Sequence, residues 1–208
     1  MTSMGSATAI AAYAAHAPRL IARYDAISSE AWYAPVRHLL PTQPSRVIDI
    51  GAGTGRDARW FAAMGHQVTA VEPVPAFIAA GQRPEGPRWV EDALPDLRRT
   101  LALNESFDLL TLSAVWQHLG PDERRIAAAN LRRLAAPGAM LLMALRHGPA
   151  SEDRPVWPID PDATALLLAE PGFAESFRIA APSIQPENLA AGVHWTWLAL
   201  TAQPEAPK

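Results

Sequence analysis

Two carboxylates and one glycine-rich turn carry the clearest chemical pattern in the sequence. Asp49 comes two residues before a turn with the spacing G-x-G-x-G, formed by Gly51, Gly53 and Gly55. Glycines at such a turn let the backbone approach a ligand closely, and a helix that starts behind the turn offers free N–H groups. Glu72 follows 21 residues after Gly51, at the end of a second expected strand. A carboxylate there can accept two hydrogen bonds from a ribose diol.

The details of the turn separate it from other glycine-rich loops. Its spacing differs from the G-x-G-x-x-G of nicotinamide and flavin enzymes. Asp49 would repel a pyrophosphate, whereas it would attract the ammonium group of a ligand that carries an amino acid. No Lys-Ser or Lys-Thr pair follows the turn, which excludes a phosphate-binding P-loop.

Apolar runs and amphipathic segments alternate through the first 145 residues. The expected strands are 46–50, 67–71, 88–90, 107–112 and 139–145, and the expected helices between them are 56–64, 75–80, 95–103 and 122–134. This alternation predicts a parallel sheet with helices on both faces. Ligands of such sheets bind at the carboxyl ends of the strands, where Asp49 and Glu72 are expected.

The two ends of the chain have different patterns. Apolar residues at steps of three and four predict one helix over 10–27, and Ser29 is the expected N-cap of a second helix that ends before Pro41. After a proline-rich loop over 148–161 we expect a helix at 162–169. Two strands, 173–181 and 193–202, follow without room for a crossover helix, so they should be antiparallel neighbours.

Composition narrows the class of protein. The 208 residues are 49% hydrophobic and 19% charged, which is typical of a globular chain. A net charge of −3 argues against a nucleic-acid partner. The absence of cysteine excludes disulfides and thiolate metal sites, and the six histidines have no metal-binding spacing, so no metal is expected. No long apolar run or signal-peptide pattern occurs, which favours a cytoplasmic protein without a membrane partner.

Taken together, these features resemble the class I S-adenosylmethionine-dependent methyltransferases over most of the chain. The resemblance implies an α/β fold, a doubly wound seven-stranded sheet that is mostly parallel with one antiparallel strand near the C-terminus. It implies a single domain, 1–208. Residues 1–44 would form a lid of two helices, 45–146 the cofactor-binding core, and 147–208 a loop, a helix and the antiparallel strand pair. The protein would be a monomer or a homodimer.

The same resemblance implies S-adenosyl-L-methionine as cofactor, with S-adenosyl-L-homocysteine as product. Glu72 would bind the ribose, Pro73 would border the adenine, and Ser113 would lie near the methionine portion. Asp92 would meet the adenine amino group, although Glu91 competes for that role. The implied cofactor-binding set is Asp49, Gly51, Ala52, Gly53, Gly55, Glu72, Pro73, Asp92, Ala93, Ser113 and Tyr24. Tyr24 either packs in the core or reaches the cofactor's carboxylate.

Polar and aromatic residues after the fourth and fifth expected strands are candidates for the substrate site. The segments Trp-x-His at 116–118 and Arg-His-Gly-Pro at 146–149 resemble those of a group of small bacterial methyltransferases. The candidate substrate-binding residues are Trp116, His118, Arg146, His147 and Trp157. His118 or His147 could act as general base, but methyl transfer to a good nucleophile can proceed by alignment alone. Trp157 either belongs to a lid or simply packs.

The expected reaction is methyl transfer to an oxygen or nitrogen of a small metabolite. An Asn-Pro-Pro-Tyr type of segment, suited to a planar amide or adenine amine, does not follow the fourth expected strand. Two alternatives remain at this point. One is a methyltransferase that acts on RNA or protein, and the other is a non-catalytic domain that keeps the fold and the cofactor.

Overall fold

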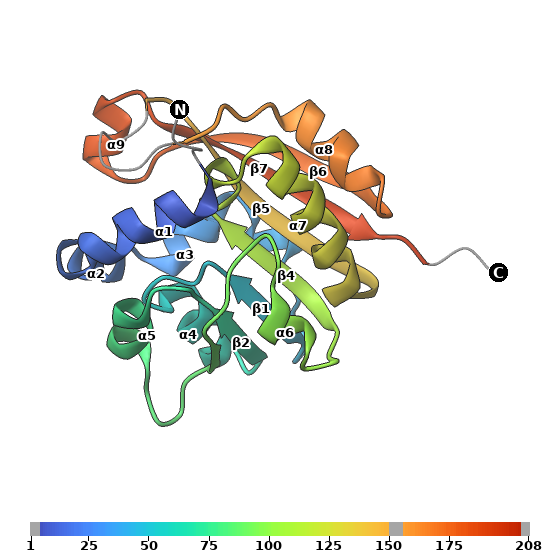
Figure 1. Ribbon diagram of the computed structural model, residues 1–208, viewed down its shortest axis with the longest axis horizontal. Helices are drawn as coiled ribbons and strands as arrows, with labels where there is room; N and C mark the ends of the chain where they lie inside the picture. The colour runs from blue at the N-terminus through green and yellow to red at the C-terminus, as the bar shows by residue number, and fades with distance from the viewer. Residues whose placement is uncertain (1–4, 150–155, 205–208) are drawn as a thin grey trace.

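The computed structural model describes residues 5–149 and 156–204, and they form one seven-stranded sheet with helices on both faces (Figure 1). The strand order is β3-β2-β1-β4-β5-β7-β6, and β7 runs antiparallel to both of its neighbours. The strands are β1 (Arg46–Ile50), β2 (Gln67–Val71), β3 (Arg88–Val90), β4 (Phe107–Ser113), β5 (Ala135–His147), β6 (Phe173–Pro182) and β7 (His194–Ala202). The predicted fold class is confirmed.

Short helices connect and cover these strands. They are α1 (Ser6–Ala15), α2 (Ala17–Asp25), α3 (Ser29–Tyr33), α4 (Arg56–Ala63), α5 (Pro75–Gly81), α6 (Arg98–Leu101), α7 (Pro121–Leu134), α8 (Pro161–Ala169) and α9 (Pro186–Ala190), with the 3-10 turns η1 (Ala34–Leu39) and η2 (Trp116–His118). None of the helices in these described ranges has the length and apolar character that a membrane span requires.

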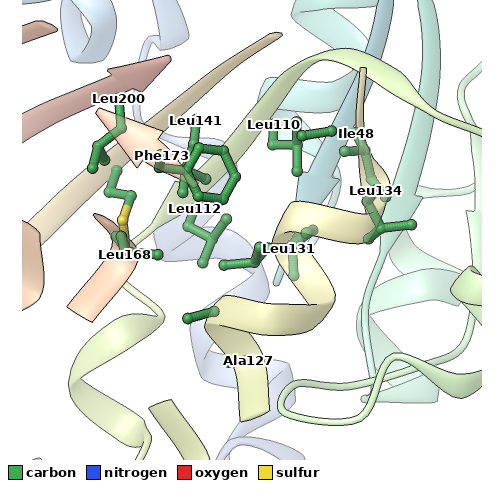
Figure 2. Close-up of a cluster of buried hydrophobic side chains, with 14 of the residues drawn as sticks. Ile48, Leu110, Leu112, Ala127, Leu131, Leu134, Leu141, Leu168, Phe173 and Leu200 are labelled. Carbon is green, nitrogen blue, oxygen red and sulfur yellow. The ribbon is translucent and has the colours of Figure 1, made fainter. Parts of the chain in front are cut away.

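One face of the sheet packs against α7 and α8. Figure 2 shows Leu131 and Leu134 of α7 directed at Ile48 of β1 and Leu110 of β4, and all four side chains are fully buried. These residues alternate along their strands with residues of the opposite face, as the pleat of a strand requires. Burying each such side chain contributes roughly 1.5–3 kcal/mol of transfer free energy.

The other face packs against α3, η1 and α4. Tyr33 of α3 lies within this layer, with its ring stacked on Trp60 and edge-on to Phe61 of α4. Since Asp49 is two residues after Val47 of the same face, its side chain also points toward α3 and α4. The core on this side therefore forms the wall behind the first carboxylate.

The N-terminal helices lie over the carboxyl ends of β1 and β4 (Figure 1). Ala17 and Leu20 of α2 pack on Val74 and Phe77, which belong to the segment after β2. The single helix predicted over 10–27 is wrong, because the chain breaks at His16 and α2 begins just before Pro18. Proline has no N–H and its ring clashes with the carbonyl group four residues earlier, so Pro18 is favoured in the first turn of a new helix.

Three other boundaries also differ from the expectation. The second helix is capped by Ser28 rather than Ser29, and its α-helical part ends at Tyr33, where the 3-10 turn η1 begins with Ala34. Its capping oxygen accepts from the backbone N–H of Ala31. The predicted helix over 95–103 is limited to α6, whose preceding residue Leu97 has a φ of 50°. Positive φ does not fit a helix, so the helix starts only after it.

The C-terminal third follows the predicted order with two differences. β6 and β7 are antiparallel neighbours, as predicted, and the connection between them contains only the five-residue helix α9, which is no crossover helix. β5 starts at Ala135 instead of 139, with an irregular segment before Met140. The predicted loop over 148–161 lies partly outside the described residues; its described parts 148–149 and 156–160 have no helix or strand, and Pro161 already begins α8.

Candidate functional site

A cavity of about 210 Å³ lies where the carboxyl ends of β1, β2 and β4 meet the N-terminal helices. Its floor is the glycine-rich turn, and its roof comes from α1 and α2. The predicted site residues that line it are Asp49, Gly51, Ala52, Gly53, Glu72, Pro73, Asp92, Ala93, Ser113, Tyr24 and His118. The structure therefore brings together residues that are far apart in the sequence, such as Tyr13 and His118 at 105 positions, in one cavity.

The glycine turn is tied directly to the end of β2. The backbone N–H groups of Gly51 and Ala52 donate to the carbonyl oxygen of Val71 at 2.8 and 3.0 Å. Gly51 has a φ of 74°, and a Cβ there would lie 2.4 Å from a methyl group of Val115. Only glycine fits this position, because the backbone conformation and the close approach both exclude a side chain.

Glu72 holds the glycine-rich turn in place through a second contact, at Gly53. Its Oε2 accepts from the backbone N–H of Gly53 at 2.8 Å, and its Oε1 accepts from that of Val74 at 2.9 Å. The side chain is 5% exposed. Burial raises the pKa of Glu72 to about 7, although the two backbone hydrogen bonds oppose this rise. A ligand that donates hydrogen bonds to this carboxylate would favour its charged form.

Asp49 occupies a similar environment at the end of β1. It is 2% exposed, and its Oδ1 accepts from the hydroxyl of Thr111 at 2.8 Å. Burial and the nearby carboxylates of Asp57 and Glu72 raise the pKa of Asp49 to about 7. Two buried carboxylates in one cavity are suited to a ligand that brings positive charge and hydroxyl donors.

A charged pair that sequence reasoning missed stands beside Asp49. Asp57, in the first turn of α4, accepts a bidentate contact from Arg56 at 2.7 and 2.6 Å and a hydrogen bond from Ser29 at 2.6 Å. Both members of the pair line the cavity. Burial lowers the pKa of Arg56, but Asp57 outweighs it and raises that pKa above its usual value. The Arg56 Nη1 makes no hydrogen bond to the described residues and remains available to a ligand.

Asp92 lines the cavity, but its carboxylate also accepts hydrogen bonds from the segment that follows it. One oxygen accepts from the backbone N–H of Ala93 at 2.9 Å, and the other accepts from the N–H and hydroxyl of Thr100 at 2.8 and 2.9 Å. The competing residue Glu91 does not line the cavity and lies 4.0 Å from Arg99 at the surface. Of the two acids, Asp92 is therefore the one placed to contact a ligand.

Ser113 ends β4 within reach of two aromatic residues of α3. Its hydroxyl oxygen accepts from the indole N–H of Trp32 at 3.3 Å and lies 3.4 Å from the hydroxyl of Tyr33. Trp32 lines the cavity together with Ser113. This cluster closes the cavity on the side of α3.

Two tyrosines of the N-terminal helices cover the opening. The ring of Tyr24 lies 3.6 Å from the position that a Cβ of Gly53 would occupy. Tyr13 lies above the end of β4, and its hydroxyl is 3.0 Å from Nε2 of His118. Phe77 of α5 packs against both tyrosine rings, at 6.4 and 5.9 Å between centroids. The helices thus contribute aromatic walls to the cavity, as the predicted lid would.

Five predicted site residues lie outside the cavity. Gly55 packs under Trp89, and Trp116 is buried in the core beside Arg124. The backbone N–H of Trp157 donates to the carbonyl of Gln117 at 2.8 Å. Two more residues, Arg146 and His147, belong to the end of β5, which the cavity does not reach.

His147 has partners of its own at that strand end. Its Nε2 lies 2.9 Å from the hydroxyl of Thr196, and its ring stacks on that of His194 at 4.9 Å. Burial and the neighbouring His194 lower the pKa of His147. Of the two histidines predicted as general base, the geometry places only His118 in the cavity. Across residues 5–149 and 156–204, no three acidic or histidine side chains gather as metal ligands would.

Sequence comparison links part of the chain to a known domain. Residues 48–141 match a family model described as a methyltransferase domain. No curated protein matches the sequence. The matched segment runs from β1 to β5 and contains the glycine turn, both buried carboxylates and His118.

Solved structures match nearly the whole chain. The 1,6-didemethyltoxoflavin N1-methyltransferase of Burkholderia thailandensis, solved with S-adenosylhomocysteine, has 22% identity and a TM-score of 0.71, covering 95% of this chain and 88% of its own. A TehB-like methyltransferase of Corynebacterium glutamicum has 20% identity and a TM-score of 0.62, covering 91% and 99%. Magnesium protoporphyrin IX methyltransferase of Synechocystis, with bound S-adenosylmethionine, has 14% identity and a TM-score of 0.61, covering 93% and 81%.

These matches establish the fold of this chain. It is the fold of the class I S-adenosylmethionine-dependent methyltransferases, as the resemblance in the sequence predicted. At such low identities the matches show the fold alone.

Proposed function

We propose that this chain is an S-adenosylmethionine-dependent methyltransferase that transfers a methyl group to an oxygen or nitrogen of a small molecule. The observation that carries the proposal is the convergence of two buried carboxylates, Asp49 and Glu72, with the open backbone of Gly51–Gly53 in one cavity. A ligand that combines an ammonium group, a ribose diol and a positive sulfonium satisfies both acids.

The residues present fit this cofactor group by group. Asp49 would accept from the ammonium group, and the free Nη1 of Arg56 would donate to the carboxylate of the same amino-acid portion. Glu72 would accept from the ribose hydroxyls, with Pro73 and Asp92 beside the adenine. When bound, the cofactor supplies an electrophilic methyl group on its sulfonium. The protein excludes water from this group by closing Tyr13 and Tyr24 over the cavity.

A small acceptor is supported by the enclosure of the cavity. Residues Ser6, Ala9 and Ile10 of α1 lie over it together with Tyr13, so a small molecule fits the covered space better than a folded macromolecule does. The Burkholderia and Synechocystis proteins are named for methylation of small molecules. The net charge of −3 also gives nucleic acid little electrostatic attraction. Among the predicted substrate-side residues, His118 lies in the cavity, and we propose that it helps to deprotonate the acceptor.

Two measurements test the proposal in sequence. S-adenosylhomocysteine should bind the protein in calorimetry, and failure to bind would remove the assignment. Incubation of a metabolite extract with cofactor that carries an isotopically labelled methyl group should then yield labelled small molecules. Label found only in RNA or protein fractions would favour the macromolecular alternative. Tight binding without any labelled product would favour a non-catalytic domain.

A further inference from the structure

Inside the cavity, a tyrosine of the N-terminal helices lies next to a histidine of the turn after β4. The Oη of Tyr13, on α1, lies 3.0 Å from Nε2 of His118, in the turn after β4. The two rings are edge-to-face, with centroids 5.3 Å apart and planes at 87°. Both side chains line the same cavity as Asp49 and Glu72. The pair therefore exists only when α1 covers the site.

The neighbouring Gln117 indicates which partner donates the proton. The Nε2 amide group of Gln117 donates to the carbonyl oxygen of Ala114, which fixes its NH₂ end on this side. The same Nε2 lies 3.4 Å from Nε2 of His118. Because an NH₂ group faces this ring nitrogen, the nitrogen carries a lone pair rather than a proton. Tyr13 then donates its O–H to His118, and its phenolic oxygen can accept a further hydrogen bond.

The charges around the pair restrict the acceptor. Four carboxylates line the cavity against one guanidinium, so an anionic acceptor is disfavoured. The sulfonium of the proposed cofactor equally disfavours a cationic acceptor. Around Tyr13 and His118, the lining includes the apolar side chains of Ala9, Ile10 and Leu119. A flat and neutral molecule suits these walls.

We propose, building on the methyltransferase function above, that Tyr13 and His118 form a proton relay for a neutral aromatic or heteroaromatic acceptor with a weakly acidic hydroxyl or ring N–H. The acceptor's proton passes to the phenolic oxygen of Tyr13, while the original Tyr13 proton passes to Nε2 of His118. The freed electron pair of the acceptor forms a bond to the methyl carbon. The carbon–sulfur bond of the sulfonium breaks, and its electrons stay on sulfur. The histidine is left protonated and returns the proton to solvent when the lid opens.

The acceptor class is tested with a panel in which the ionisable group varies. Phenols and N–H heterocycles are compared with primary alkylamines and aliphatic carboxylic acids of similar size, each with labelled methyl donor. Label should enter the first two classes. Label in amines or carboxylates, or no label in any class from protein that binds S-adenosylhomocysteine, would overturn this inference. Protein that does not bind S-adenosylhomocysteine would instead overturn the function on which the inference rests.

The relay itself is tested by Tyr13→Phe and His118→Asn on the best acceptor of the panel. Because Phe keeps the ring packing on Phe77, Y13F should fold, and kcat should fall at least about tenfold. The KM of the acceptor and the Kd of S-adenosylhomocysteine should stay within about twofold of the parent protein. Since the two groups act in one path, the double variant should be no slower than the slower single variant. A relay would be contradicted if the loss of kcat in the double variant equalled the product of the two single losses, or if the single variants changed only KM.

A matched control is His38→Asn. His38 is an exposed histidine of η1 that packs on Phe177, and neither residue lines the cavity. This variant should keep the kcat of the parent protein. A loss equal to that of His118→Asn would show that the assay reports general damage, and it would remove the evidence for the relay.

Discussion

The backbone N–H of Gly53 donates to the carboxylate of Glu72 across 2.8 Å, so the turn after β1 and the end of β2 form one rigid unit. The other oxygen of the same carboxylate accepts a hydrogen bond from the backbone N–H of Val74, the residue before α5. Each oxygen keeps a lone pair that can face the cavity. One side chain thus both shapes the ligand-binding turn and presents a hydrogen-bond acceptor to the ligand.

Replacing this carboxylate should therefore affect ligand binding more than folding. We expect Glu72→Gln to weaken S-adenosylhomocysteine binding by at least about tenfold, because hydrogen bonds to a charged group are worth roughly 1.5–3 kcal/mol. Gly53→Val should abolish binding, because a β-branched residue is strained at the φ of 55° and its methyl groups would enter the cavity that Gly53 lines. Calorimetry measures both effects.

A surface acid provides the control for these variants. Glu105 is an exposed acid that pairs with Arg88 at the edge of the sheet. Glu105→Gln should leave the affinity unchanged. Wild-type affinity in both Glu72→Gln and Gly53→Val would show that the ligand does not occupy this cavity.

The raised pKa values of Asp49 and Glu72 predict a dependence of binding on pH. Burial raises the pKa of both acids to about 7 in the protein without ligand, and a ligand that brings an ammonium group and hydroxyl donors favours their ionised forms. Affinity for S-adenosylhomocysteine should therefore increase from pH 6 to pH 8, with release of protons on binding near pH 7. Calorimetry in buffers of different ionisation enthalpy counts these protons. Uptake of protons, or affinity that is constant over this range, would contradict the charge assignment.

The same two groups predict how stability without ligand changes with pH. Their folded pKa values lie above those of the unfolded chain, so the folded state binds more protons between about pH 4 and pH 7. Their contribution to the free energy of unfolding should decrease as the pH rises through this window. Urea denaturation of Glu72→Gln should show a weaker decrease than the parent protein, since one of the two titrating groups is removed. An equal or steeper decrease would argue against buried acids as the cause.

Residues close together in the sequence could be predicted, because their geometry is local. Asp49 and the glycine turn follow directly from a strand and precede a helix, and Glu72 ends the next parallel strand, so register alone brings them together. The sequence also contains the signal for the break between α1 and α2, because Pro18 disfavours the interior of a helix. The prediction of a single helix over 10–27 relied on the apolar periodicity and neglected this proline.

Contacts between distant segments could not be predicted in the same way. Ser29 and Asp57 are 28 positions apart, and Tyr13 and His118 are 105 positions apart. Only the packing of the N-terminal helices over the sheet brings these pairs together. Conversely, His147 is the last residue of β5, which pairs with β7, and its side chain contacts Thr196 there instead of the cavity.

The buried pair of Arg56 and Asp57 should matter for stability. Their side chains are only 17% and 6% exposed. Asp57→Asn would leave a buried guanidinium without its carboxylate, which costs roughly 3–5 kcal/mol. The exposed pair of Arg46 and Asp108, with 47% and 43% exposure, is the matched control, and Asp108→Asn should cost less than about 1 kcal/mol. Urea denaturation compares the two variants, and equal losses would contradict the importance of burial.

Glu123 holds the first turn of α1 to the start of α7. Its carboxylate accepts from the backbone N–H and the hydroxyl of Ser6, at 3.0 and 2.6 Å, and from the N–H of Gly120 at 2.7 Å. Burial would raise the pKa of Glu123, but these hydrogen bonds lower it below its usual value. The carboxylate is therefore charged and bonded at neutral pH, and this stabilisation of the lid is lost as the pH falls through the acid range.

Glu123→Gln should accordingly loosen the lid without unfolding the sheet. Hydrogen exchange in residues 6–15 should accelerate about tenfold or more, because the variant weakens hydrogen bonds to a charged acceptor worth roughly 1.5–3 kcal/mol. Exchange in β4 should not change, and S-adenosylhomocysteine should dissociate faster, since Tyr13 closes the cavity only while α1 is in place. Asp122→Asn is the control, because that neighbouring acid is 95% exposed and contacts only Arg125 among the described residues. If the backbone amides of α1 exchanged at the same rate in both variants, the lid would be held by its apolar contacts on Phe77 rather than by Glu123.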